Sequence, residues 1–377
     1  MPRHGLRKVG RLALVRDEKF RDHLTPEMHP ESPRRLVAID QALAASGLLQ
    51  QVNQLEPRQA SEDELCLVHS EKYIDELQVS GQQAKRSRGL VMLDPDTWMS
   101  ADSYDTATLA AGAGLVAAEA VSARQASNSF VVVRPPGHHA LSDRPMGFCL
   151  FNNIALTARY AQKKLGYHRI LIIDWDVHHG NGTQAAFYGD PTVLFISLHQ
   201  FPFWPPNSGW YAEDGKDEGK GYNVNIPLPA GTGDRGYLKA WQELVRPLAI
   251  EFQPDLILLS AGYDAHLADP LAQQGISTPG YAELSRKLLG LALEMDRKIV
   301  AFLEGGYNTK ALSESVLATM RVLNADSLEE ARTVTAAGEP EQRAGEQALT
   351  GDAEPALVDE RIQEVRGHFS RYWQALR

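Results

Sequence analysis

The stretch Arg169-Ile-Leu-Ile-Ile173-Asp174-Trp175-Asp176-Val177-His178-His179-Gly180-Asn181-Gly182 joins a short apolar run to a cluster of acids and histidines. The apolar run is rich in branched residues and has the length of a buried strand, which is typical of a parallel sheet. Its polar continuation would then lie just past a strand end, where open α/β sheets place their binding sites. The stretch therefore predicts both a fold class and the position of a site.

The same pattern occurs at three further places in the chain. An apolar run breaks into polar residues and glycines at Ser129-Phe-Val-Val-Val-Arg134-Pro-Pro-Gly-His138-His139, at Leu256-Ile-Leu-Leu-Ser-Ala-Gly-Tyr-Asp264 and at Val300-Ala-Phe-Leu-Glu304-Gly-Gly-Tyr307. Because the carboxyl ends of parallel strands meet at one edge of a sheet, we expect the polar groups of all four stretches to share one rim.

Strand-like and helix-like segments alternate along the chain. Strands are predicted near 11–16, 129–133, 169–173, 193–198, 256–260 and 299–303, and helices near 34–47, 105–123, 153–165, 236–252 and 280–296. This alternation predicts an α/β fold with a central parallel sheet flanked by helices. We expect a single domain over 1–377, with a core of about 11–325 and a C-terminal excursion and helix over 326–377, because 325–360 has few large apolar residues.

A metal site is predicted from the acids and the histidine at two of these strand ends. Asp176 and His178 are two residues apart, so both side chains can reach a single ion, and Asp264 is the best third ligand. Two aspartates and one histidine without cysteine leave a coordination position for water, which is the catalytic pattern of zinc. Alternatively, such residues only cap the turn after the strand; repetition of the pattern at several strand ends disfavours that interpretation.

Proton transfer is assigned to the tandem His138-His139, which follows a rigid Pro-Pro-Gly turn. Asp174 and Asn181 are available as partners that fix the imidazole tautomers, and a carboxylate stabilises imidazolium more than an amide does. Tyr307 follows a glycine pair, and its hydroxyl could polarise a carbonyl beside the metal. A turn tyrosine is the more common explanation of Gly-Gly-Tyr by itself.

Composition restricts the class of protein. The chain has 377 residues, 43% of them hydrophobic, which is enough for a large core. Its two cysteines indicate a reducing compartment, and no apolar run approaches the ~20 residues that span a bilayer, so we expect a cytoplasmic protein without membrane contact. The net charge of −10 disfavours direct nucleic-acid binding and is compatible with cationic substrates. The oligomeric state, including a homo-oligomer, is left open.

Taken together, the motifs resemble the zinc-dependent histone deacetylase family. The matching segments occur in family order: His29-Pro-Glu-Ser-Pro33, Arg134-Pro-Pro-Gly-His-His139, Gly147-Phe-Cys-Leu-Phe-Asn-Asn153, Asp174-Trp-Asp-Val-His-His-Gly-Asn-Gly-Thr183, Ser197-Leu-His199, Ala261-Gly-Tyr-Asp264 and Glu304-Gly-Gly-Tyr307. The tryptophan between the aspartates and the Asn-Gly after the histidine pair resemble the class II branch and the bacterial histone deacetylase-like amidohydrolases. The resemblance implies a single-domain, three-layer fold of the arginase and deacetylase type.

The resemblance also implies roles for individual residues in the hydrolysis of an acyl-lysine amide. Asp176, His178 and Asp264 would bind zinc. His139 would be the general base that activates a water, His138 its electrostatic partner held by Asp174, and Tyr307 the donor to the substrate carbonyl. A structural potassium ion would be bound by residues around the zinc site: Asp174, Asp176, His178, Ser197 and Leu198.

A tunnel for the acylated side chain is implied as well. Gly147 and Phe148 would line it opposite Trp204, where relatives more often have phenylalanine. Leu271 and Asp96 would lie at the rim, and Asp96 could hold the backbone of a substrate.

Two alternatives to an acyl-lysine substrate stay open. The first is an acetylpolyamine or another small amide, since the same chemistry serves any acyl amide that reaches the metal. Polyamine-selective relatives carry acidic gatekeepers, whereas this chain has Leu271, which favours a lysine-type acyl substrate. The second is a non-catalytic binding module, which would require a damaged site; the ligands, the histidine pair and the tyrosine are all present.

Overall fold

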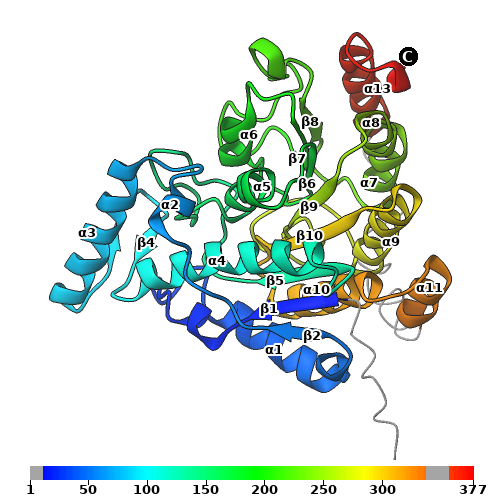
Figure 1. Ribbon diagram of the computed structural model, residues 1–377. Helices are drawn as coiled ribbons and strands as arrows, with labels where there is room; N and C mark the ends of the chain where they lie inside the picture. The colour runs from blue at the N-terminus through cyan, green and yellow to red at the C-terminus, as the bar shows by residue number, and fades with distance from the viewer. Residues whose placement is uncertain (1–11, 337–355) are drawn as a thin grey trace, which may run out of the picture.

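A central parallel sheet organises the molecule. The computed structural model describes residues 12–336 and 356–377 (Figure 1). The sheet has eight strands in the order β2-β1-β5-β10-β9-β6-β7-β8, and every neighbouring pair is parallel. The strands are β1 (Leu12–Arg16), β2 (Asn53–Leu55), β5 (Asn128–Val132), β6 (Ile170–Asp174), β7 (Val193–Gln200), β8 (Asn223–Leu228), β9 (Leu256–Ala261) and β10 (Lys298–Leu303). A separate antiparallel pair joins β3 (Val91–Met92) to β4 (Trp98–Met99).

Helices cover both faces of this sheet. On one face α4 (Ser103–Ser122) packs against α5 (Asn153–Lys164), and on the other α10 (Thr309–Leu323) packs between α1 (Arg34–Ser46) and α9 (Thr278–Met295) (Figure 1). The chain runs outward from β5 through β6 and β7 to β8, then returns through β9 and β10. Right-handed crossovers place the helices of the outward and returning paths on opposite faces. The predicted three-layer α/β fold is confirmed.

The remaining helices lie around this frame. They are α2 (Glu62–Leu65), α3 (Glu71–Ser87), α6 (Asn181–Phe187), α7 (Asp234–Ala240), the π-helical turn η4 (Trp241–Val245), α8 (Arg246–Phe252), α11 (Leu328–Ala336) and α13 (Leu357–Phe369). Short 3-10 turns occur at η1 (Glu18–Arg21), η2 (Leu48–Gln50), η3 (Asp217–Gly219) and η5 (Gln374–Leu376).

Strand order determines where the site lies. The insertion of β10 and β9 between β5 and β6 makes these four strands neighbours, although their sequences are far apart. All four are buried along nearly their whole length. Their carboxyl ends therefore bring the polar segments after Val132, Asp174, Ala261 and Leu303 to one edge of the sheet.

The predicted strands and helices are present, and several further elements escaped sequence reasoning. The edge strands β2 and β8 were not predicted, because Asn-Gln-Leu and Asn-Val-Asn-Ile-Pro-Leu lack an uninterrupted apolar run. Part of the segment expected to be loose, Leu328–Ala336, is helix α11, whose Ala331 is buried against Leu289 and Val322. Residues 337–355 of that segment lie outside the described part of the chain, and the domain limits stay a prediction.

The C-terminal segment is attached to the loop after β7. Asp214 in that loop is buried, and its Oδ2 accepts hydrogen bonds from His368 (2.9 Å), Arg371 (3.2 Å) and Tyr372 (2.9 Å). The indole N–H of Trp373 donates to the carbonyl oxygen of Gly221 at 2.8 Å. The end of the chain thus completes the packing around β8.

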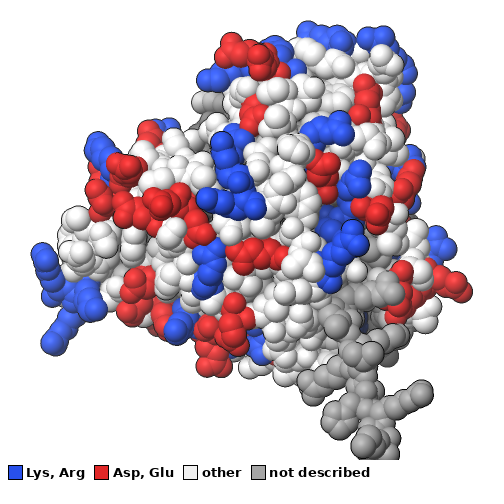
Figure 2. Space-filling view, in the orientation of Figure 1, with Lys and Arg blue, Asp and Glu red and all other residues white. Residues whose placement is uncertain are grey.

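Two surface properties of the described residues bear on possible partners. Within the described ranges, none of the helices combines the length and the apolar character that a membrane crossing requires. On the face shown in Figure 2, Lys and Arg side chains are interspersed with Asp and Glu side chains.

A buried ion-pair group connects the segment before α1 to the end of β5. Glu31 accepts hydrogen bonds from the guanidinium groups of Arg134 (2.8 Å from Nη2) and Arg35 (3.2 Å from Nη1), and all three side chains are fully buried. Burial alone would raise the pKa of Glu31, but the two arginines outweigh it and lower the pKa from 4.5 to about 2.

Stability should therefore depend on Glu31 in acid. Because the folded-state pKa is lowered, its contribution is complete above pH 4.5 and is lost as the pH falls towards about 2. Glu31→Gln also leaves two buried arginines without a counter-charge, which costs about 3–5 kcal/mol in comparable pairs. Urea unfolding at a series of pH values should show this loss at pH 7 and a smaller difference from wild type in acid. Glu18→Gln, at an 85% exposed side chain, is the control and should stay within about 0.5 kcal/mol. Equal stability of Glu31→Gln and wild type at pH 7 would contradict the prediction.

Candidate active site

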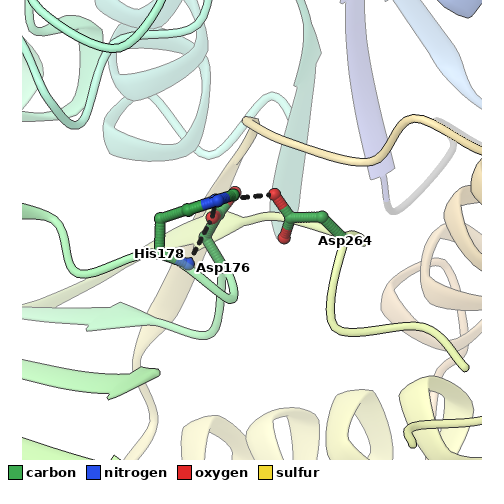
Figure 3. A group of neighbouring side chains, drawn as sticks. All are labelled: Asp176, His178 and Asp264. Atoms are coloured by element: carbon green, nitrogen blue, oxygen red, sulfur yellow. Dashed lines mark hydrogen bonds and ion pairs between the residues drawn. The ribbon is translucent and has the colours of Figure 1, made fainter. Parts of the chain in front are cut away.

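Three of the predicted ligands converge at the carboxyl edge of the sheet. Asp176 and His178 follow β6, Asp264 follows β9, and their side chains point toward one another (Figure 3). His178 Nδ1 lies 3.2 Å from Asp176 Oδ1 and 3.2 Å from Asp264 Oδ2. The potential ligand atoms all lie within 4.8 Å of one another, and both aspartates are fully buried.

Backbone amides hold the two carboxylates in place. Asp176 Oδ1 accepts from the N–H of His178 at 2.9 Å, and its Oδ2 accepts from the N–H of Gly305 at 2.8 Å. Asp264 Oδ1 accepts from the N–H of Val177 at 2.9 Å. The loops after β6, β9 and β10 are thereby tied together by the same groups that would bind a metal.

Glycines allow this close approach. A Cβ atom at Gly262 would lie 2.0 Å from Asp176 Oδ2, and one at Gly305 would lie 2.0 Å from Asp264 Oδ2. Neither position has room for a side chain, because these neighbours are buried carboxylates rather than mobile groups. The Ala-Gly-Tyr-Asp and Glu-Gly-Gly-Tyr motifs therefore need glycine for packing as well as for turning.

The donor set fits a divalent transition metal. Two carboxylates and one imidazole share a buried space, and an unbalanced pair of buried negative charges is costly without a cation. Imidazole and carboxylate are zinc ligands, and three protein ligands leave a position open.

The histidine pair lies beside this group in two different environments. His138 Nδ1 is 2.9 Å from Asp174 Oδ2, whereas His139 Nδ1 is 2.8 Å from the amide oxygen of Asn181. Burial alone would lower the pKa of His138, but the carboxylates of Asp174 and Asp176 raise it to about 10. Burial and the charges of neighbouring histidines lower the pKa of His139 well below 6.5. One imidazole is thus held protonated and the other neutral.

Asn181 also determines the tautomer of His139. Its amide oxygen can only accept a hydrogen bond, so Nδ1 of His139 carries the proton and Nε2 keeps its lone pair. The Asn181 amide nitrogen donates to Met146 Sδ at 3.3 Å, which agrees with this orientation.

Glu304 supports the turn that carries the histidine pair. Its Oε2 accepts from the N–H groups of Gly137 (2.7 Å) and His138 (3.2 Å). Burial raises the pKa of Glu304 to about 7. The acid of the Glu-Gly-Gly-Tyr motif thus contacts the Pro-Pro-Gly-His-His motif, a partnership that sequence reasoning missed.

Aromatic rings surround the approach to the metal group. Phe148 makes edge contacts with His29 (4.7 Å between ring centroids) and Tyr307 (6.0 Å). Trp204 meets His139 edge-on at 4.6 Å, and Gly147 lies between them, since a Cβ there would be 2.5 Å from both. The structure thus brings Trp204, Gly147, Phe148 and Tyr307 to the same place. The ring of Phe203 stacks on that of His178, with 5.3 Å between the centroids. The sequence did not single out this residue, because its loop is rich in aromatic residues and prolines.

The two residues predicted to lie at the rim, Asp96 and Leu271, belong to two other loops. Asp96 is partly buried, its carbonyl oxygen is 3.0 Å from His29 Nε2, and burial raises the pKa of its carboxyl to about 6. The N–H of Leu271 donates to Asp269 Oδ1 at 3.0 Å.

The residues predicted to bind potassium lie on β6, on β7 and in the loop after β6. Asp174 and Ser197 are register partners across β6 and β7, and Leu198 follows in the same buried strand. Both Asp174 oxygens accept hydrogen bonds, from His138 and from the N–H of Asp176, while Ser197 Oγ is 2.8 Å from His199 Nδ1. Potassium binding stays a prediction.

Known proteins are similar to this chain in sequence and in fold. Residues 29–323 match the histone deacetylase domain. The chain is 37% identical to a probable deacetylase of Archaeoglobus fulgidus over 97% of its own length and 99% of that protein. It is 40% identical to the polyamine deacetylase HDAC10 of Homo sapiens over 80% of its length, and the match covers 45% of that protein. The crystal structure of the HDA15 HD domain superposes with a TM-score of 0.85 at 33% identity, covering 97% of both chains.

The eight-stranded parallel sheet flanked by helices is an arginase-like α/β fold, and acids and histidines lie at its carboxyl edge. The chain belongs to the histone deacetylase family, as the sequence motifs predicted. It is a deacetylase, a hydrolase of amide C–N bonds other than peptide bonds.

Metal content provides a test of the ligand set. Asp264→Ala removes one of three ligands and should reduce bound zinc to a small fraction of one equivalent per chain, with loss of turnover. Elemental analysis after dialysis measures the zinc. Asp255→Ala, at an acid near the opposite end of β9, is the control and should keep full occupancy. Full zinc occupancy and normal turnover in Asp264→Ala would contradict the ligand assignment.

Proposed function

We propose that this deacetylase is zinc-dependent and removes acetyl or other acyl groups from the side-chain amide of acyl-lysine in proteins or peptides. The observation that carries the proposal is the convergence of Asp176, His178 and Asp264 beside a neutral and a protonated histidine. When bound, zinc would polarise the amide carbonyl and acidify a water molecule.

The two histidines divide the proton chemistry. His139 is neutral at pH 7 and keeps a free Nε2, so it can take a proton from the attacking water. His138 donates its Nδ1 proton to the Asp174 carboxylate, stays protonated and supplies positive charge beside the developing oxyanion. Because the pKa of His139 is lowered well below the ordinary 6.5 of histidine, the loss of activity in acid should begin well below that pH.

Tyr307 is proposed to stabilise the transition state. It approaches the site from the loop after β10, beside Phe148 at 6.0 Å. Burial raises the pKa of its hydroxyl well above 10, so it stays a hydrogen-bond donor throughout the working pH range.

The substrate class is proposed from the walls of the approach. Phe148, Trp204 and Phe203 offer apolar surface around the histidines, which suits the methylene stem of lysine. Leu271 at the rim carries no charge that would attract the distal amine of a polyamine. An acetylpolyamine substrate is the second candidate, since two polyamine deacetylases are among the relatives.

A panel of substrates decides between these candidates. We expect kcat/KM for acetyl-lysine peptides to exceed that for acetylspermidine and acetylputrescine by at least tenfold. The same panel with longer acyl groups determines the acyl preference. A higher kcat/KM for the polyamines would overturn the acyl-lysine proposal.

Replacement of His139 tests the general base. His139→Ala should lower kcat by about 10²–10⁴-fold while zinc remains bound, since proton transfer of this kind contributes that much. His23→Ala, at a buried histidine bound to Ser103, is the matched control and should lower stability more than kcat. A near-normal rate in His139→Ala would refute the assignment.

Removal of a single hydroxyl tests Tyr307. Loss of one oxyanion donor costs about 2.7–4 kcal/mol, so Tyr307→Phe should reduce kcat by about 10²–10³-fold with little change in KM. A hydroxamate inhibitor should still bind, although more weakly. If Tyr307→Phe keeps its kcat and loses thermal stability, the residue is a packing tyrosine.

The proposal also includes a structural potassium ion and a cytoplasmic location. The ion would be bound by Asp174, Asp176, His178, Ser197 and Leu198. The register pairing of Asp174 with Ser197 and the two free cysteines support them. Replacing potassium by tetramethylammonium in the buffer should lower thermal stability if the ion is bound.

A further inference from the structure

Asp269 links the loop after β9 to the tyrosine loop after β10. Its Oδ2 accepts from the N–H of Tyr307 at 2.6 Å and of Asn308 at 3.2 Å, and its Oδ1 accepts from the N–H of Leu271 at 3.0 Å. The side chain is 8% exposed, so water competes little for these bonds. A single carboxylate therefore determines the position of two loops at the active site.

The peptide unit before Tyr307 is held at both ends. Its N–H donates to Asp269, while its carbonyl oxygen, on Gly306, accepts from Arg35 Nε at 2.7 Å. Asp269 and Arg35 thus hold opposite sides of one peptide plane with opposite charges. Such charge-assisted hydrogen bonds are about twice as strong as neutral ones.

This peptide unit needs an external support. Gly306 has a φ of +119°, and Gly305 precedes it, so the turn itself imposes little preference on the backbone. The ring of Tyr307 makes an edge contact with Phe148, and the guanidinium of Arg35 lies 5.1 Å from the ring centroid. A rotation of the peptide plane would therefore move the phenol hydroxyl relative to the metal group.

We propose that Asp269 is a positioning residue, which holds the Gly306–Tyr307 peptide unit so that the Tyr307 hydroxyl reaches the substrate carbonyl. The inference rests on the proposed role of Tyr307. Asp269 itself does not touch the reacting atoms and acts through the backbone. The carboxylate is needed because its two oxygens accept all three N–H bonds at once. The amide of an asparagine would instead point its NH2 group at one of these backbone N–H donors.

A double-mutant cycle tests this role. Asp269→Asn should lower kcat by about tenfold or more, because small misplacements of a catalytic group are costly. In the Tyr307→Phe background the same change should alter kcat less than twofold, since no hydroxyl is left to position. Zinc content should stay at one equivalent per chain in all four proteins. Asp255→Asn is the matched control, because Asp255 also accepts two backbone N–H bonds, from His168 (2.9 Å) and Arg169 (2.8 Å), far from the site.

Each other outcome counts against the proposal. An equal loss in both backgrounds would show that Asp269 acts on the fold or the metal rather than through Tyr307. An unchanged kcat in Asp269→Asn, or its unfolding at the assay temperature, would also overturn the positioning role. If Tyr307→Phe alone keeps its kcat, the proposed function of Tyr307 fails first, and Asp269 has nothing to position.

Discussion

The arrangement of the site depends on two aspartates that the fold buries side by side. Asp176 and Asp264 are fully buried, and their oxygens accept N–H bonds from Gly305, His178 and Val177 while facing one imidazole. Two carboxylates buried this close together are stable only when backbone N–H groups and a cation balance their negative charge. The strand order β10-β9-β6 brings the three loops that carry these groups to one edge of the sheet.

Small residues make this convergence sterically allowed. Gly262 and Gly305 leave no space for a Cβ atom beside the carboxylates, and Gly180 would place one 2.4 Å from Asp174 Oδ2. Beside this centre, the pKa of His138 is raised and the pKa of His139 is lowered. His138 faces a carboxylate, whereas His139 faces an amide. The two adjacent histidines thus differ in charge because their hydrogen-bond partners differ, although the two side chains are identical.

Residues distant in the chain support the groups that are proposed to be catalytic. Glu304 holds the turn before His138, and Asp269 holds the backbone of Tyr307. Neither relationship could be predicted from a motif, because each joins residues separated by 38 positions or more. The stacking of Phe203 on His178 was equally hidden, since the loop offered several aromatic residues in succession.

By itself the sequence determined the chemistry and the fold class. Apolar runs ending in Asp-Trp-Asp-Val-His-His, Ala-Gly-Tyr-Asp and Glu-Gly-Gly-Tyr are local patterns, so strand positions and family membership followed from them, as did the prediction of a metal site. The tertiary structure decided which partner each group has: the order of β10 and β9, the edge strand β8, the tautomer of His139 and the support of Tyr307. These properties arise from contacts between distant segments, and only the folded chain brings such segments within hydrogen-bond distance.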